Sequence, residues 1–210
     1  MHFDLPEIIK AIGMFGVWAI VFAESGLLIG FFLPGDSLLF TAGFLASQGY
    51  LNIVVLTIGC FVAAVAGDQV GYMFGKKVGK RIFKKEDSLL FHKDNLMRAE
   101  KFYEAHGKKT IILARFLPVV RTFAPIVAGV GNMEYKTFLT YNLIGGFLWA
   151  VGLTVLGYFA GSLIPANVME KYLIAIIGLI IILSVAPTVF HILKDKESRE
   201  KILQMIGMKK

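Results

Sequence analysis

Phe32-Leu33-Pro34-Gly35-Asp36 interrupts one apolar segment of this chain, and Arg115-Phe116-Leu117-Pro118-Val119-Val120-Arg121 interrupts another. Both breaks contain Phe-Leu-Pro, 84 residues apart. The first break carries an acid, with Glu24 upstream of it, whereas the second carries two arginines. Proline-interrupted apolar segments in corresponding positions of two halves indicate a binding site between those halves. The sequence therefore predicts a polar site built from both halves of the chain.

The composition is that of an integral membrane protein. Of the 210 residues, 56% are hydrophobic, and the mean hydropathy of +0.68 is far above that of an ordinary soluble domain. A membrane span needs about 20 apolar residues. Stretches of this length are predicted at 11–31, 51–75, 137–164 and 172–193. The interrupted segments 32–47 and 110–131 are too broken to span as single straight helices. The first span is expected to be a membrane helix of the protein rather than a cleaved signal peptide.

Basic residues are concentrated in two regions. Residues 76–109 hold 11 Lys or Arg against 5 Asp or Glu, and residues 194–210 hold 6 against 3. The positive-inside rule places both regions, and with them the C-terminus, in the cytoplasm. Basic residues next to a membrane can interact with anionic lipid headgroups, and they need no other partner. No nucleic-acid partner is therefore expected.

A weak internal repeat relates the two halves. After the shared Phe-Leu-Pro the offset becomes 86 residues, and it pairs Ala42-Gly43 with Ala128-Gly129 and Gly71-Tyr72 with Gly157-Tyr158. With both termini cytoplasmic, each broken segment must enter the membrane and return to the side from which it came. The first segment then forms a hairpin open to the exterior, and the second forms a hairpin open to the cytoplasm. The expected fold is all-α and polytopic, with two inverted repeats that each contain a re-entrant hairpin. Chance agreement between Gly-rich apolar segments is the alternative.

The chain is interpreted as a single membrane domain, residues 1–210. Its expected parts are a first repeat at about 11–75, a cytoplasmic segment with amphipathic helices at 76–109, a second repeat at about 110–193 and a basic tail at 194–210. The N-terminus is placed in the cytoplasm together with the tail.

Five charges lie within apolar stretches: Glu24, Asp36, Asp68, Arg115 and Arg121. Each costs about 2.5–3.5 kcal/mol at the centre of a membrane helix. Such residues must pair, face water or be shielded by protein. They are therefore the candidate functional residues.

Arg115 and Arg121 are the candidate ligands for an anion. Pro118 lies midway between them and can break the helix, which lets both side chains turn toward one place. Two guanidinium forks match a phosphate monoester, which carries about −1.5 to −2 charges at neutral pH. The alternative is that both arginines form structural salt bridges with Glu24 and Asp36.

Glu24 and Asp36 are the candidate proton carriers. Burial of Glu24 disfavours its ionised form, whereas a nearby arginine favours it, and substrate binding could tip that balance. The Pro34-Gly35 break allows the chain to fold back, so that Asp36 can approach Glu24.

Three further polar residues are given supporting roles. Asp68 is expected to cap a helix or to pair with the basic loop. Asn142 and Trp149 are expected to pack or to form hydrogen bonds within the second half. For these two residues the alternative is that they line the substrate site. No residue pattern indicates a metal site, a cofactor or a hydrolase nucleophile. The chain is therefore not expected to be an enzyme.

These motifs together resemble the DedA family, also called the SNARE-associated Golgi protein or VTT-domain superfamily. The likeness covers about residues 15–165 and includes the two breaks, Gly67-Asp68, Gly71-Tyr72 and Asn142-x-x-Gly145 with Trp149. Gly146 stands where alanine is expected. The resemblance implies a bacterial inner-membrane protein with two re-entrant hairpins, in which Glu24 and Asp36 are the functional acids and Arg115 and Arg121 the essential arginines.

The resemblance also implies a role in moving lipids. Bacterial members are implicated in returning undecaprenyl phosphate across the membrane, others are linked to proton-motive-force homeostasis, and eukaryotic relatives resemble scramblases. We therefore expect a proton-coupled flippase for a polyprenyl phosphate. The alternatives are a phospholipid flippase or scramblase of broader headgroup choice, a lipid-phosphate hydrolase, and a scaffold whose charges are structural. The oligomeric state stays open, and a homodimer is compatible with the sequence.

Overall fold

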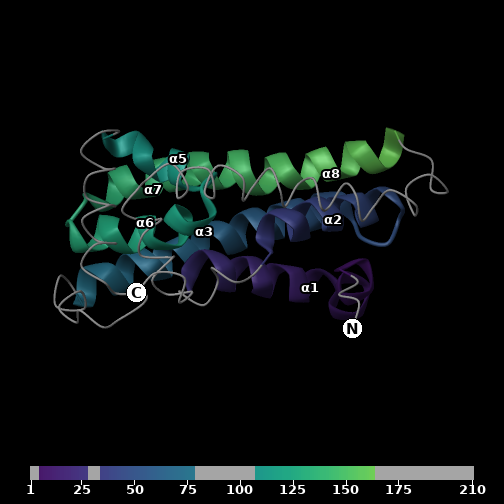
Figure 1. Ribbon diagram of the computed structural model, residues 1–210, viewed down its shortest axis with the longest axis horizontal. Coiled ribbons are helices and arrows are strands. Elements are labelled where there is room, and N and C mark those ends of the chain that lie inside the picture. Colours follow the sequence, from purple (N-terminus) through teal and green to yellow (C-terminus); the bar gives the residue numbers. More distant parts are fainter. Residues whose placement is uncertain (1–4, 28–33, 79–106, 164–210) are drawn as a thin grey trace, which may run out of the picture.

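The computed structural model describes residues 5–27, 34–78 and 107–163, which are helical throughout apart from short connections. Figure 1 shows the helices lying alongside one another in an elongated bundle. Their bounds are α1 Leu5–Gly26, α2 Gly35–Ser47, α3 Ile53–Val78, a 3₁₀ turn Gly107–Lys109, α5 Thr110–Ala114, α6 Pro118–Val130, α7 Tyr135–Gly146, a π-helical segment Phe147–Val151 and α8 Gly152–Leu163.

Three helices are long and apolar enough to cross a bilayer: Leu5–Gly26, Ile53–Val78 and Tyr135–Leu163, the last formed by α7, the π-helical segment and α8 together. They agree with three of the four predicted spans. The fourth, 172–193, lies outside the described residues, as do the basic tail and most of the segment 76–109.

The helices beside the two breaks are too short to span. α2 and α6 have 13 residues each, which at 1.5 Å per residue rise about 20 Å, against a hydrocarbon core of about 30 Å. α6 begins at Pro118, where the missing N–H costs no helical hydrogen bond, and the preceding Leu117 is extended, as is favoured before proline. The break predicted at Pro118 is therefore confirmed.

Each short helix packs along a long helix from the other half of the chain. α2 runs parallel to α8, since Asp36 bonds to Trp149 at one end and Gln48 to the Gly161 carbonyl at the other. α6 runs parallel to α3, because Gly71 faces Pro125 and Gly129 faces Lys76. Figure 1 shows α2 beside α8.

Glycines make these two contacts close. A Cβ on Gly157 would overlap the Phe40 carbonyl of α2, and a Cβ on Gly75 would overlap the Ile126 carbonyl of α6. Residues 40 and 126 are themselves 86 apart, the offset of the internal repeat. Gly75 and Gly157 are 82 apart, so the two contacts correspond except for a shift of about one helical turn along the long helix.

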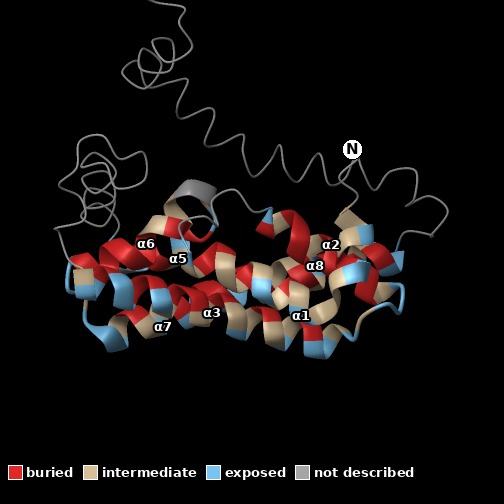
Figure 2. Ribbon diagram, turned by 90° about the horizontal axis from the view of Figure 1, so that it is seen from below, coloured by how far each residue is buried: buried red, intermediate tan, exposed pale blue. Residues whose placement is uncertain are grey.

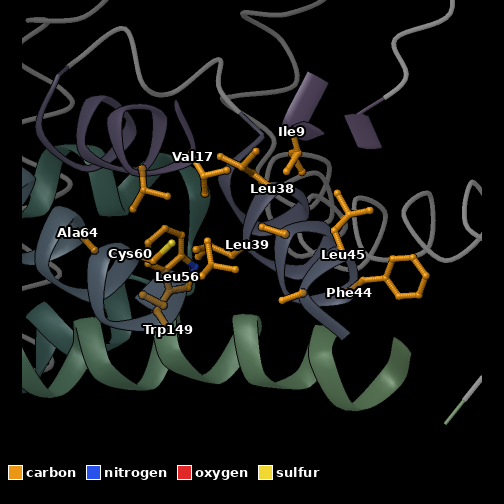
Figure 3. Packing of buried hydrophobic residues seen from close by; sticks show 14 residues of the cluster. Ile9, Val17, Leu38, Leu39, Phe44, Leu45, Leu56, Cys60, Ala64 and Trp149 are labelled. Atoms are coloured by element: carbon orange, nitrogen blue, oxygen red, sulfur yellow. The ribbon is translucent and has the colours of Figure 1, made fainter. Parts of the chain in front are cut away.

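The main apolar core lies between α1, α2, α3 and the helix that carries Trp149. Figure 3 shows Leu39, Leu56, Cys60 and Trp149 converging there. In Figure 2 buried positions line the facing sides of the helices, while exposed positions occur on their outer sides. Large apolar side chains such as Phe15 and Val62 are exposed, as a lipid-facing surface requires.

Candidate functional site

The five charged residues predicted from the apolar stretches all lie in one region, in two ion-pair groups. The first group, called here the outer group, consists of Arg121, Glu24 and Asp36. The second, the inner group, consists of Arg115, Asp68 and Asn142. The carboxylates come from α1, α2 and α3, and the arginines from the segment of the second break.

In the outer group, one arginine bonds two acids. Arg121 Nη1 donates to Asp36 Oδ1 at 2.6 Å, and Arg121 Nη2 donates to Glu24 Oε1. The Glu24 side chain is 1% exposed and that of Asp36 is 18% exposed. Asp36 is therefore the member of the group that lies nearest to the surface.

The two acids meet because a glycine stands between them. Glu24 lies near the end of α1, and α2 begins at Gly35. A Cβ on Gly35 would overlap the Glu24 carboxylate. The break at Pro34-Gly35 thus brings Asp36 beside Glu24, as expected, and glycine is needed for this close approach.

In the inner group, Arg115 is enclosed by acceptors. Its Nη2 donates to Asp68 Oδ2 and Asn142 Oδ1, both at 2.6 Å, and to the Ala64 carbonyl at 3.3 Å. Arg115 is 3% exposed and Asp68 4% exposed. The Asn142 side chain is itself oriented by a bond to the Val65 carbonyl.

Two pairing expectations are corrected by these contacts. Asp68 was expected to serve the basic loop, but it lies ten residues before the end of α3, about 15 Å along the axis. It pairs with Arg115 instead. The alternative interpretation, that both arginines form salt bridges with Glu24 and Asp36, is right for Arg121 and wrong for Arg115.

Trp149 lies against both groups. Its indole N–H donates to Asp36 Oδ1 at 2.7 Å. The guanidinium carbons of Arg115 and Arg121 lie 5.7 and 5.0 Å from its ring centroid, within the range of a cation–π interaction. Trp149 sits in the π-helical segment, an irregularity that is frequent at functional sites.

The cluster holds unequal numbers of charges. Three carboxylates face two guanidiniums, so the fully ionised cluster carries one excess negative charge. Some hydrogen-bonding capacity is also unused: among the described residues, the buried atoms Glu24 Oε2, Arg115 Nε and Arg121 Nε have no partner. The cluster therefore combines carboxylates with guanidinium N–H groups that are not all in use.

The helix ends around the cluster add positive potential. α2 and α6 both direct their N-termini toward it, since Asp36 and Arg121 lie in their first turns. The residues that precede the two helices, Pro34 and Leu117, form no side-chain capping bond, and at α2 the Gly35 backbone N–H faces the Glu24 carboxylate. Helix N-termini with free N–H groups attract anions.

Comparison with known proteins is consistent with this arrangement. Residues 33–159 match the VTT domain. Protein DedA of Escherichia coli strain K12 is 42% identical over 206 residues, which cover 94% of this chain and 92% of that protein. The uncharacterized membrane protein ML0287 of Mycobacterium leprae is 46% identical over 160 residues, covering 75% of this chain and 71% of that one.

A third relative is more distant. The inner membrane protein YqjA of Escherichia coli strain K12 is 33% identical over 183 residues, covering 85% of this chain and 81% of that protein. No solved structure matches the chain significantly. The fold of the described residues is helical and has three helices long enough to span a bilayer. Together with the domain match and the extent of these similarities, this shows that the chain is a membrane protein of the DedA family.

Proposed function

We infer that the protein is a lipid transporter, a proton-coupled flippase for a polyprenyl phosphate such as undecaprenyl phosphate, and not an enzyme. The observation that carries this proposal is the buried bonding of Arg121 to both Glu24 and Asp36. An arginine of the second half is held there by carboxylates of the first half, and a phosphate can take their place.

The chemistry of the site favours a phosphate. Arg121 already presents two N–H groups to two acidic oxygens, which is the arrangement that a phosphate accepts. The N-termini of α2 and α6 supply further donors. Half-helix N-termini that face anionic substrate groups are a known feature of transporters.

Charge balance supports coupling to protons. A phosphate monoester adds up to two negative charges to a buried cluster that already has one in excess. Protonation of Glu24 and Asp36 would remove two negative charges and release Arg121 at the same time. Headgroup binding and proton uptake would then be linked, so that a pH gradient could drive transport. Two protons that move with a doubly charged headgroup carry no net charge across the membrane.

The packing of the helices supports transport between inverted repeats. Each short helix lies on a long helix of the other half, with glycines in both contacts. We propose that α2 belongs to one re-entrant hairpin and α5 with α6 to the other, that they open to opposite faces, and that both termini are cytoplasmic in a bacterial inner membrane. Rocking of one half against the other would alternate access to the site.

The second candidate is a phospholipid flippase or scramblase of broader headgroup choice. The residues of both ion-pair groups bind charge, and none of them would distinguish a polyprenyl chain from a diacylglycerol. A lipid-phosphate hydrolase is less favoured, because the carboxylates of the cluster are already engaged by guanidiniums.

The test is reconstitution in liposomes that contain labelled polyprenyl phosphate, with and without a pH gradient. Headgroup movement that follows the gradient supports the coupled flippase, while movement indifferent to pH indicates a scramblase. Release of phosphate indicates a hydrolase, and no movement indicates a scaffold. Glu7→Gln is the matched control for Glu24→Gln, since Glu7 lies on the same helix in an exposed ion pair with Lys10.

A further inference from the structure

Trp149 connects two ion-pair groups that otherwise have separate partners. Within the described part of the chain, the outer group is bonded through Arg121 and the inner group through Arg115, and no hydrogen bond is seen between the two. The indole ring is close to both guanidiniums and is itself only 2% exposed. A change in either group therefore alters a contact of the same ring.

The indole also bonds directly to an acid. Asp36 Oδ1 accepts from Arg121 at 2.6 Å and from Trp149 at 2.7 Å. Hydrogen bonds to a carboxylate favour its ionised form. Protonation of Asp36 would weaken both bonds together and would free the ring that lies against Arg115.

The helix that carries Trp149 also carries Asn142. The two residues are seven apart, about two turns, so they lie on one face. Asn142 orients Arg115, and Trp149 contacts both arginines. The π-helical segment begins between them, at Phe147, so a local change of winding there would move Trp149 relative to Asn142.

From these contacts we propose that Trp149 is a positioning residue that holds both arginines on one ring and links the protonation of Asp36 to their release. The proposal rests on the proposed function where it concerns the headgroup. The link between Asp36 and the arginines stands on the contacts alone.

The charged surroundings of Asp36 limit what else can titrate there. They comprise Glu24 of α1, Arg121 of α6, Arg115 after α5 and Asp68 of α3. The packed helix α8 has Tyr158 as its one titratable residue, and α2 has none besides Asp36. A test must therefore separate Asp36 from Glu24 and Asp68 by single substitutions.

The first test needs no transport. The chain has two tryptophans, so Trp18→Phe leaves Trp149 as the sole indole fluorophore. We expect its emission to change with pH in the purified protein. Asp36→Asn should abolish the main transition, whereas Glu24→Gln and Asp68→Asn should shift it. Emission that is constant across pH, or a transition that survives Asp36→Asn, would overturn the proposal.

The same reporter tests the shared contact with both arginines. Arg115→Lys and Arg121→Lys should each change the emission at fixed pH, because each replaces a planar guanidinium near the ring. Lys10→Gln is the control, since Lys10 lies over Tyr50 at the other end of α1 and should leave the emission unchanged. An effect of only one arginine would contradict the linking role.

The second test uses transport. Trp149→Phe keeps an aromatic ring but removes the N–H that bonds to Asp36. The midpoint of the transport pH profile should then shift by about one unit. Trp149→Leu should also lower the apparent affinity for polyprenyl phosphate about tenfold. Trp18→Phe is the control, because its indole donates to the Leu56 carbonyl, away from the charges.

The outcomes separate the two proposals. If the wild-type protein moves no lipid but Trp149 emission behaves as expected, the transport function fails and the positioning role stands. If lipid moves and neither Trp149→Phe nor Trp149→Leu changes the pH profile, the positioning role fails alone. Thermal unfolding of each variant in detergent shows that it is folded at the temperature of the assay.

Discussion

Arg121 and Asp36 lie in the first turns of α6 and α2, and their side chains meet at 2.6 Å. An acid in the first turn of a helix is stabilised by the helix dipole, whereas an arginine there is not. Arg121 is therefore held in an unfavourable place by two carboxylates. That balance makes the outer group the natural place for an incoming anion to compete.

Arg121→Lys should reduce transport by more than tenfold and leave membrane insertion intact. A lysine keeps the charge but cannot direct two planar N–H groups at two separate carboxylates. Transport in liposomes and the yield of folded protein in membranes are the measurements. Lys10→Gln, in an exposed pair, serves as the control, and full activity of Arg121→Lys would remove the argument from guanidinium geometry.

Gly35→Ala should abolish transport and destabilise the protein by about 1–3 kcal/mol. The new Cβ would overlap the Glu24 carboxylate, so α2 must shift away from α1. Denaturant unfolding in detergent measures the loss. Gly152→Ala is the matched control, because nothing lies within 4 Å of its Cβ position.

A second substitution makes the Gly35 prediction sharper. Glu24→Asp shortens the side chain and should partly restore the stability of Gly35→Ala. If the two effects simply add, the overlap with Glu24 is not the cause of the destabilisation.

Asp68→Asn should destabilise the protein by about 1–3 kcal/mol, since the buried Arg115 would lose its charged partner. Combining it with Arg115→Gln should recover stability, because no unpaired charge then remains, but it should not recover transport. Equal stability of the single and double variants, measured by unfolding in detergent, would mean that the unpaired charge of Arg115 is not the cause of the destabilisation.

Gly43→Val and Gly129→Val should destabilise the protein by similar amounts, about 1–3 kcal/mol each. The two glycines are 86 residues apart, and a side chain on either would enter backbone of the opposing long helix, at Thr154 and at Tyr72. Thermal unfolding compares the two. A large effect at one position and none at the other would argue against equivalent packing in the two halves.

Much of the candidate site could be predicted from the sequence because charges are costly in apolar segments. Glu24, Asp36, Asp68, Arg115 and Arg121 stand out on that ground alone. The break at Pro118 follows from the missing N–H of proline. Both kinds of signal are local, so a single sequence reveals them.

The partners of Asp68 and Arg115 could not be predicted. Asp68 and Arg115 are 47 positions apart, on different helices, and no spacing rule connects them. The only indication was the surplus of one acid, which implies a pairing beyond Glu24 and Asp36. The contact of Trp149 with both arginines depends on the π-helical winding at Phe147–Val151, for which the sequence has no marker.

The central claim is that a phosphate headgroup and the acids Glu24 and Asp36 compete for the same arginine. The most direct measurement is the transport of polyprenyl phosphate by Glu24→Gln in liposomes at several pH values, beside Glu7→Gln. Because glutamine imitates the protonated acid, we predict tighter headgroup binding and transport that follows the pH gradient less steeply, while Glu7→Gln behaves as the wild type. Asp36 can still titrate in this variant, so a changed rather than an abolished pH dependence is the expected result. A Glu24→Gln protein that keeps both the wild-type affinity and the wild-type pH dependence would contradict the account.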